Sequence, residues 1–244
     1  ANGRDFVGRV FQETGIALDI ISPAEEARLA VMGCHALLEA GDGPALIFDI
    51  GGGSTELILV DTSTTSRQGP PDIISWYSAP WGVVSLSEYE ENEPETAEGR
   101  FASYRRMCEL VQESFADFAR SLPRGIKPLR LLGTSGTVTT LASLHLDLPA
   151  YDRRAVDGLI VPAQSMRTIS TRLSNLSLAQ RRDVPCIGRE RADLVVAGCA
   201  ILDTILDLWP ANRLGVADRG IREGILRSLI GISPNLGDDT GANP

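Results

Sequence analysis

The sequence predicts an α/β fold, in which strands and helices combine around a sheet. The apolar runs 45–48 and 57–60 enclose a glycine turn, which predicts two consecutive strands. The apolar runs 129–132 and 213–217 each lead through a short polar turn into a helical pattern. Strands that alternate with helices in this way are typical of α/β sheets.

The composition narrows the class of protein. The chain has 244 residues, 43% of them apolar, enough for one large domain or two small ones. No apolar run approaches the roughly 20 residues of a membrane span. The net charge of −9 argues against a general nucleic-acid binder. Four widely spaced cysteines without a C-x-x-C pair favour the reduced thiols of a cytosolic protein over a disulfide or metal framework.

The basic residues are almost all arginine, because Lys127 is the only lysine among the 23 cations. Arginine suits bidentate contacts with phosphate. Genome composition produces the same bias, so the arginines alone do not identify a ligand.

The most informative stretch runs from Asp49 to Glu56, with the sequence D-I-G-G-G-S-T-E. Three glycines permit positive φ angles and leave the backbone open to a ligand. Successive N–H groups, together with the hydroxyls of Ser54 and Thr55, predict an anion site. Asp49 and Glu56 lie at the mouth of the turn, and carboxylates beside a phosphate require a divalent cation such as Mg²⁺. The alternative is an ordinary hairpin with a solvated Glu56.

A second turn of similar chemistry comprises Gly133, Thr134, Ser135, Gly136 and Thr137, between a strand and a helix. Ligands of α/β sheets bind at the carboxyl ends of strands, where helix N-termini offer N–H groups to anions. One such turn is equally well an ordinary helix cap. Two in one chain predict a site for a chain of phosphates or a nucleotide.

A helix start is predicted at Ser22, with Ser22 at the N-cap, Pro23 at the first helical position and the helix running to about residue 38. Glu25 and Glu26 fall in its first turn, where favourable interaction with the helix dipole is sufficient to explain them. A strand is predicted just before, at residues 16–21.

The rest of the chain is predicted from its periodicity. Residues 73–78 form a strand, 80–86 a bend and 88–98 a solvated acidic segment with six glutamates. Helices are expected at 99–122, 163–173, 179–183, 221–230 and, as the longest, 188–209, with a loop at 149–161 and a strand at 213–217. Residues 233–244 have the composition of a disordered tail. The two histidines have no partner spacing typical of a catalytic base.

Four segments in this order resemble the exopolyphosphatase / guanosine pentaphosphate phosphohydrolase (Ppx/GppA) family: 21–29, 49–57, 132–137 and 216–224. The resemblance covers nearly the whole chain. It implies a ribonuclease H-like fold of the actin-like and sugar-kinase-like ATPase superfamily, with a mixed sheet flanked by helices. Pro23 and Ala24 depart from the family, whose members commonly carry glycine and a polar residue there.

The resemblance also implies a domain plan. Family members begin with a domain that carries a further phosphate loop of the D-x-G-(S/T)-N-S type, and no such motif occurs here. Residues 1–20 are therefore expected to be the end of that missing domain. Residues 21–232 would form the second, ribonuclease H-like domain, followed by the tail at 233–244.

The implied activity is Mg²⁺-dependent hydrolysis of terminal phosphoanhydride bonds in inorganic polyphosphate or guanosine pentaphosphate (pppGpp). Glu26 matches the glutamate that activates water, and Asp49 and Glu56 match the acidic positions around the metal. The phosphate-binding positions match Gly51, Gly52, Gly53, Ser54, Thr55, Gly133, Thr134, Ser135, Gly136 and Thr137. A cytoplasmic homodimer without membrane or nucleic-acid partners is expected, and the chain by itself should be weakly active or inactive.

Two alternatives remain at this level. A phosphotransferase of the sugar or acetate kinase type shares the superfamily, but it needs an acceptor pocket, whereas a hydrolase releases phosphate without an acceptor. A non-catalytic module that binds ligand or dimerises would retain the same loops without turnover.

Overall fold

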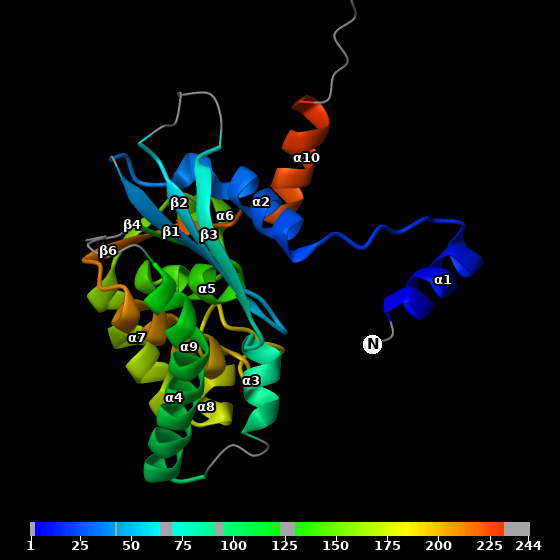
Figure 1. Cartoon of the computed structure of the whole chain (residues 1–244). Helices are drawn as coiled ribbons and strands as arrows, with labels where there is room; N and C mark the ends of the chain where they lie inside the picture. The colour runs from blue at the N-terminus through cyan, green and yellow to red at the C-terminus, as the bar shows by residue number, and fades with distance from the viewer. Residues whose placement is uncertain (1–2, 42, 64–69, 91–94, 123–129, 232–244) are drawn as a thin grey trace, which may run out of the picture.

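A computed structural model describes residues 3–41, 43–63, 70–90, 95–122 and 130–231. Its centre is one six-stranded sheet with the strand order β3-β2-β1-β4-β6-β5 (Figure 1). The central strands β1, β4 and β6 are parallel, while β2, β3 and β5 run antiparallel to their neighbours. The strands are β1 (Pro44–Ile50), β2 (Thr55–Asp61), β3 (Asp72–Ala79), β4 (Arg130–Thr134), β5 (Ile160–Pro162) and β6 (Arg213–Ala217).

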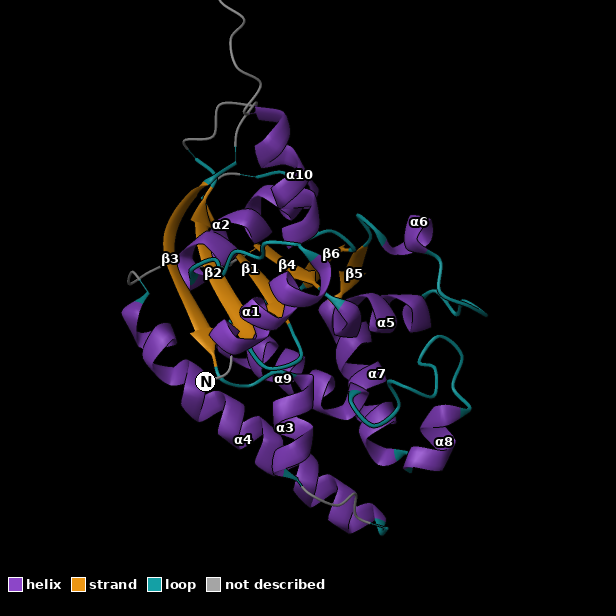
Figure 2. Ribbon diagram, turned by 90° about the vertical axis from the view of Figure 1, so that its right-hand side faces the viewer, coloured by secondary structure: helices purple, strands orange, loops and turns teal. Residues whose placement is uncertain are grey.

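Helices cover both faces of the sheet (Figure 2). One face packs against α2 (Pro23–Cys34), which in turn packs against α10 (Ile221–Gly231). The other face packs against α4 (Ala97–Ser121), α5 (Gly136–His145), α7 (Ala163–Asn175) and α9 (Val195–Leu208). The smaller helices are α1 (Gly3–Thr14), α3 (Val83–Tyr89), α6 (Arg153–Val156), α8 (Leu178–Arg182) and the 3₁₀ turn His35–Leu37. The predicted α/β class, a mixed sheet flanked by helices, is confirmed.

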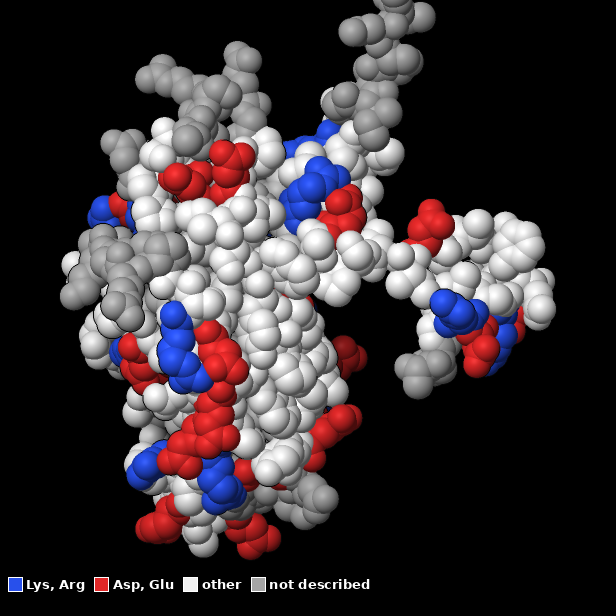
Figure 3. Space-filling view, viewed as in Figure 1, with Lys and Arg blue, Asp and Glu red and all other residues white. Residues whose placement is uncertain are grey.

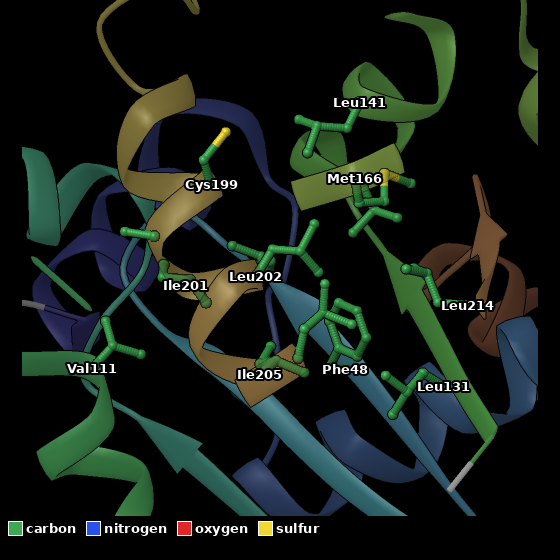
Figure 4. Packing of buried hydrophobic residues seen from close by; sticks show 14 of the residues in the cluster. Phe48, Val111, Leu131, Leu141, Met166, Cys199, Ile201, Leu202, Ile205 and Leu214 are labelled. Carbon is green, nitrogen blue, oxygen red and sulfur yellow. The ribbon is translucent and has the colours of Figure 1, made fainter. Parts of the chain in front are cut away.

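The larger core lies between the sheet and α9. Ile201, Leu202 and Ile205 of α9 point toward Phe48 of β1 (Figure 4), and all four side chains are fully buried. Strand β4 passes beneath the same ring: a Cβ on Gly133 would lie 2.5 Å from the Phe48 ring. Glycine is therefore required at this position for packing.

The pair α2 and α10 packs unusually closely. A Cβ added to Gly33 would lie 1.9 Å from the carbonyl oxygen of Gly220, and one added to Gly224 would lie 1.9 Å from that of Leu29. No side chain fits at either contact. The two helices therefore meet backbone to backbone, and α2 is held against the turn that precedes α10.

Most predicted elements are confirmed. The strand–glycine turn–strand unit is β1 and β2, the helix predicted at 99–122 is α4, and the strand–turn–helix unit at 129–142 is β4 with α5. The hydroxyl of Ser22 accepts a hydrogen bond from the N–H of Glu25 at 3.2 Å, as an N-cap residue does, and Pro23 opens α2.

The strand predicted at residues 16–21 is wrong, because no strand forms there. A strand requires a neighbour for its backbone hydrogen bonds, and this segment connects α2 to α1, which lies away from the body (Figure 1) and has no buried residue. Ile16, Ile20 and Ile21 are accordingly exposed.

Three other predictions are corrected. The bend expected at 80–86 is largely the helix α3, and the loop expected at 149–161 contains α6 and the start of β5. The helix predicted at 188–209 begins only at Val195, and α4, with 25 residues, is the longest helix of the described residues. Gly188 has a φ of +74° and starts a series of turns instead. The tail at 233–244 and part of the acidic segment lie outside the described residues.

All four cysteines are free. Within the described part of the chain, no helix combines the length and apolarity that crossing a membrane requires. On the face drawn in Figure 3, acidic and basic side chains are interspersed over the surface of α4 and its surroundings, and no continuous basic stripe is visible there.

Candidate phosphate and metal site

One row of residues crosses the sheet and positions the candidate site. Ser78, Glu56, Asp49 and Thr134 occupy directly paired positions on four neighbouring strands. Paired residues project from the same face of a sheet, and here that face is the one covered by α2. The row therefore places two acidic side chains next to each other, as the sequence predicted, beside the helix that carries Glu26.

Glu56 is held in one orientation. It is only 7% exposed, and the hydroxyls of Ser54 and Ser78 both donate to its Oε1, at 2.7 and 2.9 Å. The second oxygen, Oε2, has no hydrogen-bond partner among the described residues. One carboxylate oxygen is thus fixed by the protein and the other is available to a ligand.

Asp49 lies in an environment that opposes its ionisation. Burial, and then the negative charges of Glu56 and Glu26, raise its pKa to about 7, although the nearby Ser135 side chain acts in the opposite direction. In the part of the chain described, none of these three carboxylates forms an ion pair with a basic residue. The cluster carries negative charge without a compensating cation.

The two glutamates of the first turn of α2 differ in their surroundings. Glu25 receives two hydrogen bonds from the Arg28 guanidinium, at 2.6 and 2.8 Å, and these lower its pKa. Glu26 has no such partner in the described part of the chain, and burial together with the charge of Glu56 raises its pKa. Glu26, not Glu25, therefore belongs to the acidic cluster.

The first glycine loop, residues 51–54, presents free N–H groups. Among its N–H groups, that of Gly51 donates to the carbonyl of Ser54 at 2.9 Å. The N–H groups of Gly52, Gly53 and Ser54 make no hydrogen bond within the described chain. Such a concave run of donors is suited to an anion.

The start of α3 determines the shape of this loop. The N–H groups of Val83 and Val84 donate to the carbonyls of Gly51 and Gly52, at 2.9 and 2.8 Å, and the Ser85 hydroxyl lies 3.2 Å from the carbonyl of Gly53. A Cβ on Gly82 would lie 2.4 Å from the backbone of Gly52. Because the loop carbonyls are engaged by α3, they are held away from the ligand side.

The second loop is held in a strained conformation at Ser135. This residue has φ 83° and ψ 175°, a region almost restricted to glycine, and its hydroxyl donates to the carbonyl of Ile50 at 2.6 Å. Strain of this kind persists where the surrounding structure maintains it, and it is common at functional sites. The bond ties the second loop to the end of β1, immediately beside Asp49.

Both loops line one pocket of about 210 Å³. Gly51 and Gly52 contribute one wall and Ser135, Gly136 and Thr137 another, with Arg191 at the rim. The Arg191 Nη1 lies 3.0 Å from the position of a Cβ on Gly136, and its guanidinium has no ion pair with any described residue. Sequence reasoning missed Arg191, because it belongs to no local motif and is one of many arginines.

Several predicted residues lie beside the pocket without facing it. The Thr55 hydroxyl donates to the carbonyl of Trp81, and the Thr134 hydroxyl donates to that of Arg219, both at 2.7 Å. Gly133 lies beneath Phe48, and the hydroxyl of Ser54 is engaged by Glu56. The structure favours supporting roles for these four, while Gly53 is exposed at the loop tip.

Asp49 and Glu56 are the residues of this site that could hold a divalent metal ion. No cluster of three His, Cys, Asp or Glu side chains with metal-binding geometry occurs among the described residues. Magnesium is commonly held by one or two carboxylates, with water and substrate phosphates completing the octahedron. Asp49 and the free oxygen of Glu56 provide that partial set.

The sequence model of the Ppx/GppA phosphatase family matches residues 1–231. The chain belongs to this family. Among curated Ppx/GppA relatives, exopolyphosphatase 2 of Mycobacterium tuberculosis is 29% identical over 222 residues, which cover 89% of this chain and 65% of the relative. Guanosine-5'-triphosphate,3'-diphosphate pyrophosphatase of Aeromonas hydrophila is 26% identical over 94% of this chain and 42% of its own length. The chain thus spans less than two thirds of these proteins.

Solved structures of Ppx/GppA proteins share the fold. The Aquifex aeolicus family member superposes with a TM-score of 0.73 at 26% identity, over 94% of this chain and 69% of its own. An exopolyphosphatase from Cytophaga hutchinsonii gives a TM-score of 0.77 at 22% identity, over 95% of this chain. The actin-like, ribonuclease H-like architecture expected from the resemblance is confirmed.

Proposed function

We propose that this chain contributes the metal-binding and water-activating half of a hydrolase that removes the terminal phosphate of inorganic polyphosphate or guanosine pentaphosphate. One observation carries the proposal. Three carboxylates without a compensating cation, Glu26, Asp49 and Glu56, lie beside two loops that offer free N–H groups. The names of the Mycobacterium and Aeromonas relatives support the two substrates.

The two loops and Arg191 would bind the phosphates. The N–H group of Gly52 and those at the start of α5 would face the developing charge on the transferred phosphoryl group. Arg191 provides a charged fork suited to the next phosphate. Asp49 and Glu56 would hold a magnesium ion, which neutralises phosphate oxygens when it is bound.

Glu26 is the proposed general base. Its carboxylate would accept a proton from a water molecule as the water oxygen attacks the terminal phosphorus. The bond from that phosphorus to the bridging oxygen breaks, and the shortened phosphate chain leaves with the electron pair. The raised pKa of Glu26 makes it a better proton acceptor than an ordinary surface glutamate.

Phosphate release is the direct test. The full-length protein, with Mg²⁺ and no acceptor, should release phosphate from polyphosphate or guanosine pentaphosphate, and Asp49→Asn should raise the Mg²⁺ concentration required for half activity. The control is Asp61→Asn, which makes the same change at the end of β2 opposite the glycine loop. Release only with a sugar or acetate acceptor would indicate the phosphotransferase instead.

Because the chain covers only part of its relatives, we expect it to bind phosphate weakly and to turn over little by itself. Closure of a second domain would supply water exclusion and the remaining phosphate contacts. A chain extended at its N-terminus should be far more active, and equal rates from the two would contradict this division of the site. That the protein is a cytoplasmic homodimer remains a prediction. Analytical sedimentation would test its oligomeric state.

A further inference from the structure

A second hollow adjoins the phosphate pocket. It has a volume of about 430 Å³, within the range of roughly 300–1,000 Å³ that small-molecule sites occupy. Two segments far apart in the sequence form it: the one that follows α5 and the one that precedes α9. Its lining consists of Pro149, Ala150, Tyr151, Cys186, Ile187, Gly188 and Arg191. We refer to it as the Tyr151 groove.

Arg191 joins the groove to the phosphate pocket. Among the described residues it alone lines both hollows, and its guanidinium lies against Gly136 of the second phosphate loop. A ligand whose terminal phosphate occupies the loops would therefore pass Arg191 on its way into the groove. The groove lies where the remainder of a longer phosphate ligand would be located.

The chemistry of the groove does not suit further phosphates. Arg191 is the sole cation in its described lining, and the other side chains are apolar, aromatic or sulfur-containing. Additional phosphates would lose hydration there without gaining a counter-charge. A flat heterocyclic ring would instead exchange water for apolar contact and would stack on the face of an aromatic side chain.

Tyr151 is available for such stacking. Its side chain is 47% exposed, and its phenol lies close to the side chains of Asp218 and Thr139. Asp218 follows β6 and Thr139 belongs to α5, so the ring lies beside the same elements that form the phosphate site. A tyrosine ring has few side-chain torsions and therefore loses little conformational freedom when a base stacks on it.

We infer that the Tyr151 groove binds the nucleoside of a guanosine polyphosphate, with its 5'-phosphates extending past Arg191 to the glycine loops. The inference rests on the proposed function, since it requires phosphate at the loops. It assigns the discrimination between the two substrate classes to this groove. Polyphosphate would use the loops and Arg191 alone, whereas a nucleotide would gain the additional contact with Tyr151.

The test compares two ligands with the same triphosphate. GTP and inorganic tripolyphosphate are titrated calorimetrically, with Mg²⁺, into the chain carrying Glu26→Gln to suppress turnover. The chain with Tyr151 intact should bind GTP about tenfold more tightly than tripolyphosphate, because stacking of a base on an aromatic ring is worth about that factor. Tyr151→Ala should remove this advantage and leave the affinity for tripolyphosphate unchanged.

Two further variants distinguish stacking from a general disturbance. Tyr151→Phe keeps the ring and should retain most of the preference for GTP. Phe101→Ala removes an aromatic side chain that is 59% exposed on α4 and lines neither hollow, and it should alter neither affinity. Arg191→Ala should weaken both ligands together.

The outcomes separate the inference from the function on which it rests. Equal affinities for GTP and tripolyphosphate in the wild-type groove, or a preference for GTP that survives Tyr151→Ala, would overturn the inference while leaving phosphate binding intact. A chain that binds neither ligand would contradict the proposed phosphate site itself. Loss of the preference for GTP in Tyr151→Ala, but not in Tyr151→Phe or Phe101→Ala, would support a nucleoside subsite.

Discussion

Asp49 provides a quantitative test of the acidic cluster. In the unfolded chain it should ionise near its ordinary pKa of 3.8, whereas in the folded chain burial and neighbouring carboxylates hold the pKa at about 7. Between these values the folded state retains a proton that the unfolded state has lost. The free energy of unfolding should therefore fall as the pH rises through this window and become constant above it.

The size of the effect follows from the shift. A rise from 3.8 to about 7 corresponds to about 4 kcal/mol, at roughly 1.4 kcal/mol per pH unit. Asp49 keeps some contact with solvent, so a loss of about 2–4 kcal/mol is expected. Asp49→Asn resembles the protonated acid and should lack this dependence. At pH 8 and without metal, the variant should be more stable than the wild type by that amount.

Urea denaturation at several pH values between 4.5 and 8, with chelator present, measures this difference. The pH dependence of all other groups is largely shared by the two proteins, so the difference between them isolates Asp49. Added Mg²⁺ should restabilise the wild type at pH 8 and leave Asp49→Asn unaffected. Parallel curves for the two proteins would show that Asp49 carries no raised pKa, and the argument for an uncompensated cluster would then fail.

Three shorter predictions concern the other parts of the site. Glu26→Gln in the full-length enzyme should lower kcat by about 10²- to 10⁴-fold with little change in KM, and turnover within threefold of the wild type would remove Glu26 from the mechanism. Ser135→Gly should be more stable than Ser135→Ala by about 1–3 kcal/mol in thermal unfolding, because both lose the bond to Ile50 but only glycine relieves the strain; equal stabilities would argue against strain. Gly82→Ala should displace the first loop and weaken tripolyphosphate binding, whereas Ser87→Ala should not, because the buried Ser87 hydroxyl has no hydrogen-bond partner among the described residues. Comparable losses in both variants would contradict the role of Gly82.

The parts of the fold that sequence predicted are those determined by neighbours in the chain. The N-cap at Ser22 depends on residues within one turn, and the opposition of Asp49 and Glu56 follows from a short glycine loop between two apolar strands. Residues 16–21 have the composition of a strand, but strand formation depends on a partner that composition does not reveal. Val83 and Val84 are likewise typical strand formers, yet their N–H groups engage loop carbonyls and start a helix.

In the candidate site, too, the features determined by neighbouring residues were predictable, and those determined by tertiary packing were not. The loops were predictable because glycine, serine and threonine gather in consecutive positions. Arg191 lies more than 50 residues from the second loop in sequence, and only the packing of the α9 region against α5 brings it to the pocket. The family resemblance had singled out Glu26 rather than Glu25, and the structure adds a physical difference between them, because Glu25 forms an ion pair with Arg28.

The backbone contact between α2 and α10 has a mechanical consequence. Helices separated by side chains can slide as those side chains change rotamer, but Gly33 and Gly224 leave no such layer between these two. A displacement of α10 must therefore carry α2 with it, along with Glu26 at its first turn. Arg227 adds a second attachment, since it donates to the carbonyl of Met32 at 2.7 Å. The two helices should therefore move as one rigid unit, so that a displacement of α10 also changes the position of the proposed base, Glu26.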